Sequence, residues 1–252
     1  MYSLLKKVIF FAFLVGIWEL LFRQGVWPEY VLPSPLSVGK TLINGFHDKT
    51  LLIGIAISMK RIAIGYGISV VIGVSLGLLT GRVKLFDDTV GSLISGLQTL
   101  PTICWLPLSM LWFGLNDRAI IFLVAMGAVL SITLGTDAGA KSVPPLYIRA
   151  ARTMGAKGWK LYVDVIIPAI LPHIITGMKQ GWAYAWRSLM AAELLMVCLG
   201  LGHLLTVGRE LNDMSRVIAV MVVLATIGIL VDRVFFAKVE RRIRERWGLT
   251  KV

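Results

Sequence analysis

The stretch Ile62 to Gly81 reads IAIGYGISVVIGVSLGLLTG and contains no charged residue. A helix of about 20 mostly apolar residues rises about 1.5 Å per residue, which is enough to cross a hydrocarbon layer about 30 Å thick. Small residues recur at every fourth position, along one face where a second helix can approach closely; they are Gly65, Ser69, Gly73, Gly77 and Gly81. The stretch therefore predicts a membrane-spanning helix with a tight packing seam inside the fold, the alternative being a point of bending.

Comparable uncharged runs occur elsewhere in the 252 residues, and one soluble core could not use so many. The chain is 57% hydrophobic and 16% charged, whereas soluble domains are about 45–50% apolar and about 25% charged. We therefore predict an all-α integral membrane protein with about six transmembrane helices, the third of them broken by Pro101 and Pro107. The six predicted spans are residues 8–23, 58–81, 89–114, 118–137, 165–198 and 214–236.

The net charge of +12 is concentrated between and beyond the apolar runs. Lys and Arg gather in the loop 138–163 and in the basic tail 237–252, and cytoplasmic loops of membrane proteins carry such an excess. This distribution favours cytoplasmic N- and C-termini, with membrane lipid and not nucleic acid as the surroundings. The two cysteines and three histidines have no metal-ligand spacing, so no metal site is expected.

The loop 138–163 is the most informative polar segment. Pro144 and Pro145 are typical of a helix start, while Gly155 and Gly158 favour a turn between two short helices. The loop also carries more apolar residues than a solvated linker needs, namely Leu146, Ile148, Met154, Trp159 and Leu161. A partner protein would explain them; the alternative is that they lie on lipid or on the rest of the fold.

The same loop resembles the EAA loop of binding-protein-dependent ABC importer permeases. That motif is Glu-Ala-Ala, three residues, Gly, nine residues and Ile-x-Leu-Pro. This chain has Ala150-Ala151, three residues, Gly155, nine residues and Val165-Ile-Ile-Pro168. Arg149 stands where the motif has Glu, which leaves the ion pair of that Glu in doubt.

The resemblance extends over nearly the whole chain, in the order of the sulfonate, taurine and nitrate branch of the family. It includes Leu32-Pro-Ser-Pro35, Leu100-Pro-Thr-Ile-Cys-Trp-Leu-Pro107, Pro172, Gly177 and Trp186-Arg-Ser-Leu-Met-Ala-Ala-Glu193. It implies a MetI-like permease fold, a single transmembrane permease domain over residues 1–252, and a multi-pass location in a bacterial cytoplasmic (inner) membrane. The expected cargo is a small oxyanion such as an alkanesulfonate, taurine or nitrate.

The resemblance also implies the partners. The loop would dock as a coupling helix on an ABC-type ATPase subunit, present in two copies. A second permease therefore follows, in a homodimer or in a heterodimer with a similar chain. A periplasmic or lipid-anchored substrate-binding protein would deliver the solute, and ATP and Mg would bind the ATPase and not this chain. The residues carried over as the ATPase-coupling loop are Arg149, Ala150, Ala151, Met154, Gly155, Ala156 and Pro168.

Polar groups inside the predicted spans are the candidates for a translocation path, because charges in a membrane are costly. Lys179, Arg187 and Glu193 lie in the fifth span, and a guanidinium suits an oxyanion through forked hydrogen bonds. Gln98, Thr99 and Thr102 flank the break at Pro101, where freed backbone groups need a cavity or protein to satisfy them. The alternative interpretations are a structural interhelical pair and a plain kink.

No catalytic arrangement is present in the sequence. There is no P-loop GxxxxGK[ST], so we expect no enzyme activity and ATP hydrolysis by a separate subunit. A membrane-embedded enzyme would need paired acids or metal ligands near one interface. An ion-coupled carrier or channel without an ATPase is the main alternative, but it does not explain the loop 138–163.

Overall fold

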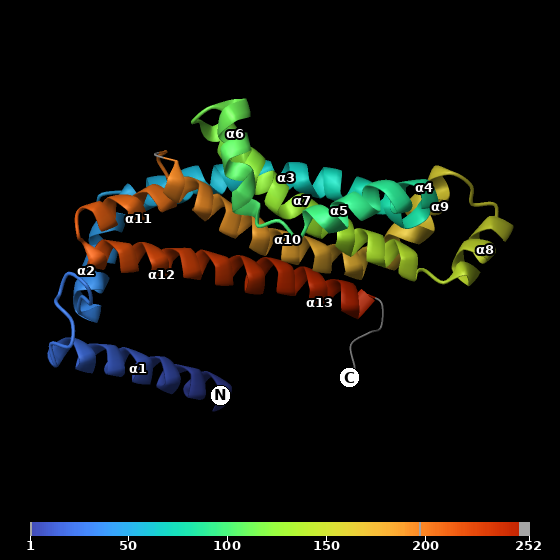
Figure 1. The fold of residues 1–252 in the computed structure, drawn as a ribbon. Helices are drawn as coiled ribbons and strands as arrows, with labels where there is room; N and C mark the ends of the chain where they lie inside the picture. Colours follow the sequence, from blue (N-terminus) through green and yellow to red (C-terminus); the bar gives the residue numbers. More distant parts are fainter. Residues whose placement is uncertain (1, 197, 247–252) are drawn as a thin grey trace. The chain divides into compact units, whose positions relative to one another are not determined.

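The computed structural model describes residues 2–196 and 198–246, which form helices and turns and no strand (Figure 1). These residues fall into two compact units. One is drawn from Met1–Ser58 and Glu193–Thr226, and the other from Met59–Ala192 and Ile227–Val252. The predicted tail 237–252 lies within the described residues up to 246.

Two of the helices lie wholly in the first half of the chain and belong to the first unit, α1 (Tyr2–Arg23) and α2 (Pro35–His47). Both units share the long helices α3 (Thr50–Arg82), α10 (Ile167–Leu195) and α12 (Met214–Leu230), and the first unit also contains α11 (Leu201–Glu210). The remaining elements belong to the second unit: α4 (Lys84–Phe86), η1 (Asp87–Gly91), α5 (Ser92–Leu97), η2 (Thr102–Trp105), α6 (Leu106–Phe113), α7 (Asp117–Ser142), α8 (Pro145–Thr153), α9 (Trp159–Leu161), η3 (Tyr162–Ile166), η4 (Val231–Phe236) and α13 (Ala237–Arg246).

Four helices of the described chain are long and apolar enough to cross a membrane, Thr50–Arg82, Asp117–Ser142, Trp159–Leu195 and Met214–Ile243. They correspond to the predicted second, fourth, fifth and sixth spans. The other two predicted spans, 8–23 and 89–114, are not among these four helices. Helix α1 carries four charged residues, Lys6, Lys7, Glu19 and Arg23. Residues 89–114 form no single helix, because the backbone leaves the helical conformation between α5 and η2 around Pro101.

The predicted packing seam of α3 is confirmed, and α7 is the helix that packs on it. A Cβ added to Gly77 would lie 2.5 Å from both the Thr133 carbonyl oxygen and the Thr136 Cβ. Gly65, Gly73 and Gly81 are equally close to α7, with ideal Cβ positions 2.5–2.8 Å from Val124, Ile132 and Ala140. Absence of a Cβ therefore sets the close approach of the two helices.

Helix α7 packs on α10 in the same way along its other side. A Cβ on Gly135 would lie 2.6 Å from Gly177 Cα, and one on Gly139 would lie 2.6 Å from His173 Cβ. The inner position of α7 explains its buried polar residues: Ser131, Thr133 and Thr136 are enclosed between helices. Within this unit α3, α7 and α10 lie side by side, and α8 and α9 lie at one end of them (Figure 1). This stack positions both candidate sites.

Candidate functional site

The predicted loop 138–163 contains one short helix and a glycine turn, and not the expected pair of short helices. Residues 138–142 are the end of α7, and α9 continues through η3 into α10 as the single helix Trp159–Leu195. We keep the name hairpin for α8, the turn after it and α9. Helix α8 begins at Pro145, directly after Pro144, and ends at Thr153. The Gly155 N–H donates to the Arg152 carbonyl at 3.0 Å and the Ala156 N–H donates to the Ala151 carbonyl at 2.9 Å. This pair of bonds is a Schellman cap, which needs a residue with positive φ, and Gly155 has φ of 88°. The spacing from Ala151 to Gly155 is therefore the spacing of a helix C-cap.

The hairpin divides its side chains between an inner and an outer face. Ala151 is only 8% exposed and packs with Val143, Leu161 and Ile170 in a small core that also includes Ala140, Ile166 and Ile174. Its small side chain therefore serves the hairpin's own packing. Ala156 is partly buried against the same core, and Pro168, the second residue of α10, is half-buried. Of the residues predicted for docking, Ala151 and Ala156 thus face the core, and Pro168 lies in α10, outside the exposed turn.

The outer face combines apolar and basic groups. Met154 is 88% exposed and Trp159 is 77% exposed, and Leu146 is also exposed. Arg149 and Ala150 are exposed on the same short helix. Within the hairpin sequence 141–163 there are five basic residues and no acidic one. We name the exposed residues Leu146, Arg149, Ala150, Met154 and Trp159 the hairpin face.

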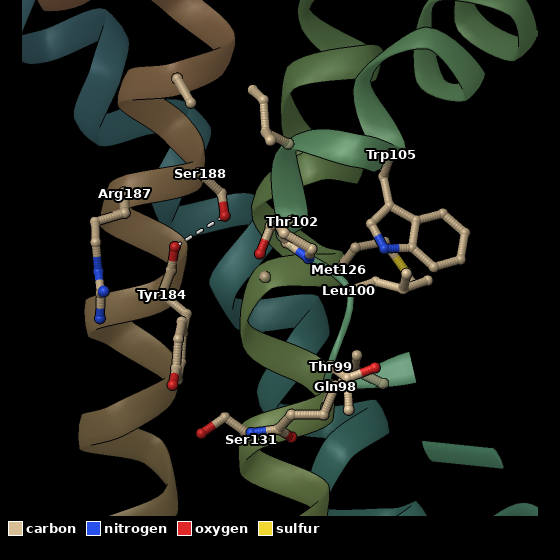
Figure 2. Close-up of a pocket in the computed structure, with 15 residues that line it drawn as sticks. Gln98, Thr99, Leu100, Thr102, Trp105, Met126, Ser131, Tyr184, Arg187 and Ser188 are labelled. Carbon is tan, nitrogen blue, oxygen red and sulfur yellow. Dashed lines mark hydrogen bonds between the residues drawn. The ribbon is translucent and has the colours of Figure 1, made fainter. Parts of the chain in front are cut away.

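A cavity of about 370 Å³ lies between α7, α10 and the segment that follows α5. It brings together four of the six predicted path residues, Gln98, Thr99, Thr102 and Arg187. Figure 2 shows Tyr184, Arg187 and Ser188 on α10 on one side, and Gln98, Thr99 and Thr102 from the broken segment on the other. None of its fifteen described lining residues is acidic.

Arg187 is exposed and is held by its own helix. Its Nε donates to the Ala183 carbonyl at 3.0 Å, and its guanidinium lies 4.8 Å from the centre of the Tyr184 ring. Stacking on a ring orients a guanidinium but leaves most of its N–H donors available. The group can therefore bind an anion from the cavity.

Lys179 and Glu193 are not among the residues that line this cavity. Lys179 makes an ion pair with Asp232 of η4, with 3.0 Å between Nζ and Oδ1. In the first unit, Glu193 is 1% exposed. Its two carboxylate oxygens each accept from the Ser58 hydroxyl at 2.8 Å, and one accepts from the Gly202 N–H at 2.9 Å. Both side chains thus have partners within the protein.

The Glu193 carboxylate caps the start of α11. The Leu201 N–H donates to Ser58 Oγ at 2.9 Å, so the first two amides of that helix are satisfied by this pair. A negative charge is stabilised at a helix N-terminus. Gly200 and Gly202 leave room for it, since a Cβ on either would lie 2.5 Å from Glu193 atoms.

Several lining residues were not predicted from the sequence. Tyr184 and Ala191 lie three residues before and four residues after Arg187, so helical spacing from Arg187 could have found them. Trp105 also lines the cavity. Ser131 comes from α7, and its place in the cavity lining depends on how α7 packs against α10. Among residues 2–196 and 198–246, no group of three or more His, Cys, Asp or Glu residues could hold a metal ion.

The sequence is similar to a known family of transport proteins. Residues 69–245 match the family described as binding-protein-dependent transport system inner membrane component. A putative ABC transporter permease protein of Methanocaldococcus jannaschii is 36% identical over 236 residues, covering 92% of this chain and 88% of the relative. A nitrate import permease of Synechocystis is 28% identical, covering 92% and 86% of the two chains.

One further relative and one solved structure are also similar to this chain. A putative aliphatic sulfonates transport permease of Bacillus subtilis is 28% identical, covering 96% of this chain and 87% of that one. An inward-facing structure of the MetNI methionine ABC transporter has the same fold, with a TM-score of 0.65 at 19% identity over 77% of this chain and 96% of that one. The all-helical, MetI-like fold is therefore confirmed, and the chain belongs to the family of binding-protein-dependent transport system inner membrane components.

Proposed function

We propose that this chain is the permease subunit of an ATP-driven importer, and that the hairpin face docks on a separate ATPase. The observation that carries the proposal is the hairpin itself. A Schellman cap closes α8, and Ala151 packs in a core that the hairpin shares with α7 and α10, while Met154 and Trp159 remain exposed. Apolar groups presented on a rigid short helix are suited to a groove on a partner.

The assembly we propose contains two copies of the permease and two ATPases, because each chain carries one hairpin. ATP and Mg bind the ATPases, and this chain hydrolyses no ATP. A periplasmic or lipid-anchored binding protein delivers the solute. The hairpin and both termini then face the cytoplasm of a bacterium, in agreement with the distribution of Lys and Arg. The five basic residues of 141–163 favour an acidic rim around the groove of the ATPase.

The cargo we propose is a small oxyanion. Arg187 lies in a cavity whose described lining has no acidic residue, and Gln98, Thr99 and Thr102 add polar groups opposite it. A guanidinium binds planar or tetrahedral oxyanions through two parallel hydrogen bonds. Nitrate and aliphatic sulfonates, which appear in the names of the relatives, have this chemistry.

A pull-down from the native host tests the docking proposal. The tagged chain, extracted in mild detergent, should recover a soluble P-loop ATPase in roughly equal amount. Met154→Asp should reduce the recovery by about tenfold or more, since a central apolar contact is worth about 2 kcal/mol. Leu115→Asp is the matched control, because Leu115 is also apolar and largely exposed but lies outside the hairpin. Recovery of the unsubstituted chain alone would instead support a carrier or channel without an ATPase.

Uptake measurements test the cargo. Cells that express the importer with its binding protein should accumulate labelled nitrate or an alkanesulfonate. Arg187→Met should lower that uptake by about tenfold, because a charge-assisted hydrogen bond contributes about 1.5–3 kcal/mol. Arg187→Lys should restore part of it, since the charge remains and the fork is lost. Arg118→Met, at an exposed position outside the cavity, is the control. Unchanged uptake in Arg187→Met would exclude this arginine as the anion site.

A further inference from the structure

The end of α7 is tied to a separate segment of the chain through Lys141. Its Nζ lies 2.6 Å from Asp87 Oδ1 and 2.9 Å from Asp137 Oδ2. Asp137 is one turn earlier on α7, whereas Asp87 is the first residue of the π-helical turn η1. Single π-helical turns interrupt the regular hydrogen-bond ladder and occur frequently at functional sites. The ion pair therefore joins α7 to the segment 84–97.

That segment has few other polar links to α7. The described side-chain hydrogen bonds of Thr89 and Ser95 stay within the segment, on Leu85 and Gly91. A crevice of about 400 Å³ lies between it and α7, and polar groups such as Asp88, Ser92 and Thr133 line it. Ile94 is the buried side chain of α5. A contact with one apolar anchor and a polar crevice can slide more readily than a close-packed seam.

The far end of the same segment forms the wall of the cavity. Helix α5 follows η1 without a break and ends at Leu97, and its C-cap residue Gln98 lines the cavity with Thr99 and Thr102. Asp87 and Gln98 are eleven residues apart, and a helix of that length spans about 16 Å. A displacement of Asp87 along this helical segment would therefore move Gln98, Thr99 and Thr102 in the cavity wall.

The hairpin lies close to Lys141, at the opposite end of this segment from the cavity. Lys141 is four residues before the start of α8, and Val143, between them, is buried in the core that holds Ala151. Figure 1 shows α4, α8 and α9 at the same end of this unit. The hairpin and the last turn of α7 share one core, so a pull on α8 acts on Lys141.

We propose that Lys141, bridging Asp87 and Asp137, is the positioning residue that transmits movement of the hairpin to the Gln98–Thr102 wall of the cavity. This inference rests on the proposed function. It does not require the pair to stabilise the fold: Lys141 and Asp87 are both partly exposed, and exposed pairs contribute little to stability. Variants at these positions should therefore fold.

The test measures movement of the wall directly. The full chain, with the ATPase that it recovers, is placed in nanodiscs after Cys104→Ser, Cys198→Ala and Leu100→Cys substitutions. Leu100 is exposed in the cavity wall, so its reaction with a small maleimide reports the wall's accessibility. Adding ATP and Mg with vanadate should change the labelling rate by about tenfold, because most molecules would shift from one conformational state to the other.

Lys141→Met and Asp87→Asn should each abolish this change while the ATPase stays bound, and Lys141→Arg should restore it. Lys238→Met is the control, because Lys238 is an exposed lysine outside the hairpin and outside the segment 84–97. A full ATP-dependent change in either Lys141→Met or Asp87→Asn, with the ATPase bound, would overturn the relay alone. Failure of the unsubstituted chain to bind an ATPase would overturn the proposed function and the relay with it.

Discussion

The α3–α7 seam and the 138–163 hairpin both depend on glycine, but for opposite reasons. At Gly77 the backbone is helical and no space exists for a Cβ. At Gly155 nothing lies within 4 Å of an ideal Cβ, and it is the φ of 88° that an L side chain rarely adopts. The seam is thus built for contact within the chain, and the hairpin is built to hold a shape while its outer face stays free. Substitutions should separate the two roles.

The largest effect is expected in the seam. Gly77→Val should destabilise the protein by about 3 kcal/mol or more, since the new side chain meets backbone and side-chain atoms of α7 that cannot both move away. Size-exclusion profiles and unfolding midpoints in detergent measure it. Gly67→Ala, on the same helix but with nothing within 4 Å of its Cβ, should be neutral or stabilising by up to about 1 kcal/mol. Equal behaviour of the two variants would show that the seam is not close-packed.

A second close-packed region is the cap at Glu193. Glu193→Ala should cost about 2–3 kcal/mol, because the Ser58 hydroxyl and the Gly202 amide lose their acceptor in a buried place. The unfolding midpoint should fall and transport should fall with it, in proportion to the folded protein. Glu210→Ala, at the exposed end of α11, is the control. Normal stability with abolished transport would return Glu193 to the list of path residues.

A smaller effect on stability, with a specific effect on binding, is expected at Gly155. A β-branched residue in a left-handed conformation costs about 1–2 kcal/mol locally, so Gly155→Val should distort the cap of α8 and leave the membrane helices intact. Recovery of the ATPase in a pull-down should drop at least about tenfold, at an unchanged size-exclusion profile. Undiminished recovery would mean that the hairpin does not need its capped shape to dock.

The smallest effect is expected at the start of α3, in the first unit. The hydrogen bonds from the Thr50 side chain and backbone lower the pKa of the Asp48 carboxyl, which caps that helix. A lowered pKa means that the ionised carboxyl stabilises the cap above the ordinary pKa of about 4 and that this stabilisation is lost as pH falls further. Hydrogen exchange at the Thr50 amide should accelerate below that pH relative to neighbouring amides. Asp48→Ala should exchange fast at every pH and show no such transition.

Much of the fold followed from the order of the residues. The period of four from Gly65 to Gly81 identified the face of α3 that packs, and Pro144, Gly155 and Gly158 marked the start and the turns of the hairpin. These features depend on local backbone preferences and on helical geometry, which the sequence states directly. The direction of Ala151, by contrast, depends on Val143 and Ile170, which lie elsewhere in the chain.

The candidate path shows the same division. From the sequence, Lys179, Arg187 and Glu193 lie on one predicted helix, and all three were equal candidates for the translocation path. The structure gives them different surroundings: an ion pair with Asp232, a cavity without acidic residues, and a buried helix cap. The sequence shows that a charged residue lies in a span, but its role depends on partners that are far away in sequence.

The sequence by itself determined the membrane class, the packing face of α3, the hairpin and the family, since each rests on composition, period or local spacing. The tertiary structure alone decided which polar residues share a cavity, which residues of the hairpin stay exposed, and that Lys141 joins α7 to Asp87. The physical reason is that these properties are contacts between segments that chain order leaves independent. Only the packing of the helices brings such segments together, as the 2.6 Å distance between Lys141 Nζ and Asp87 Oδ1 shows.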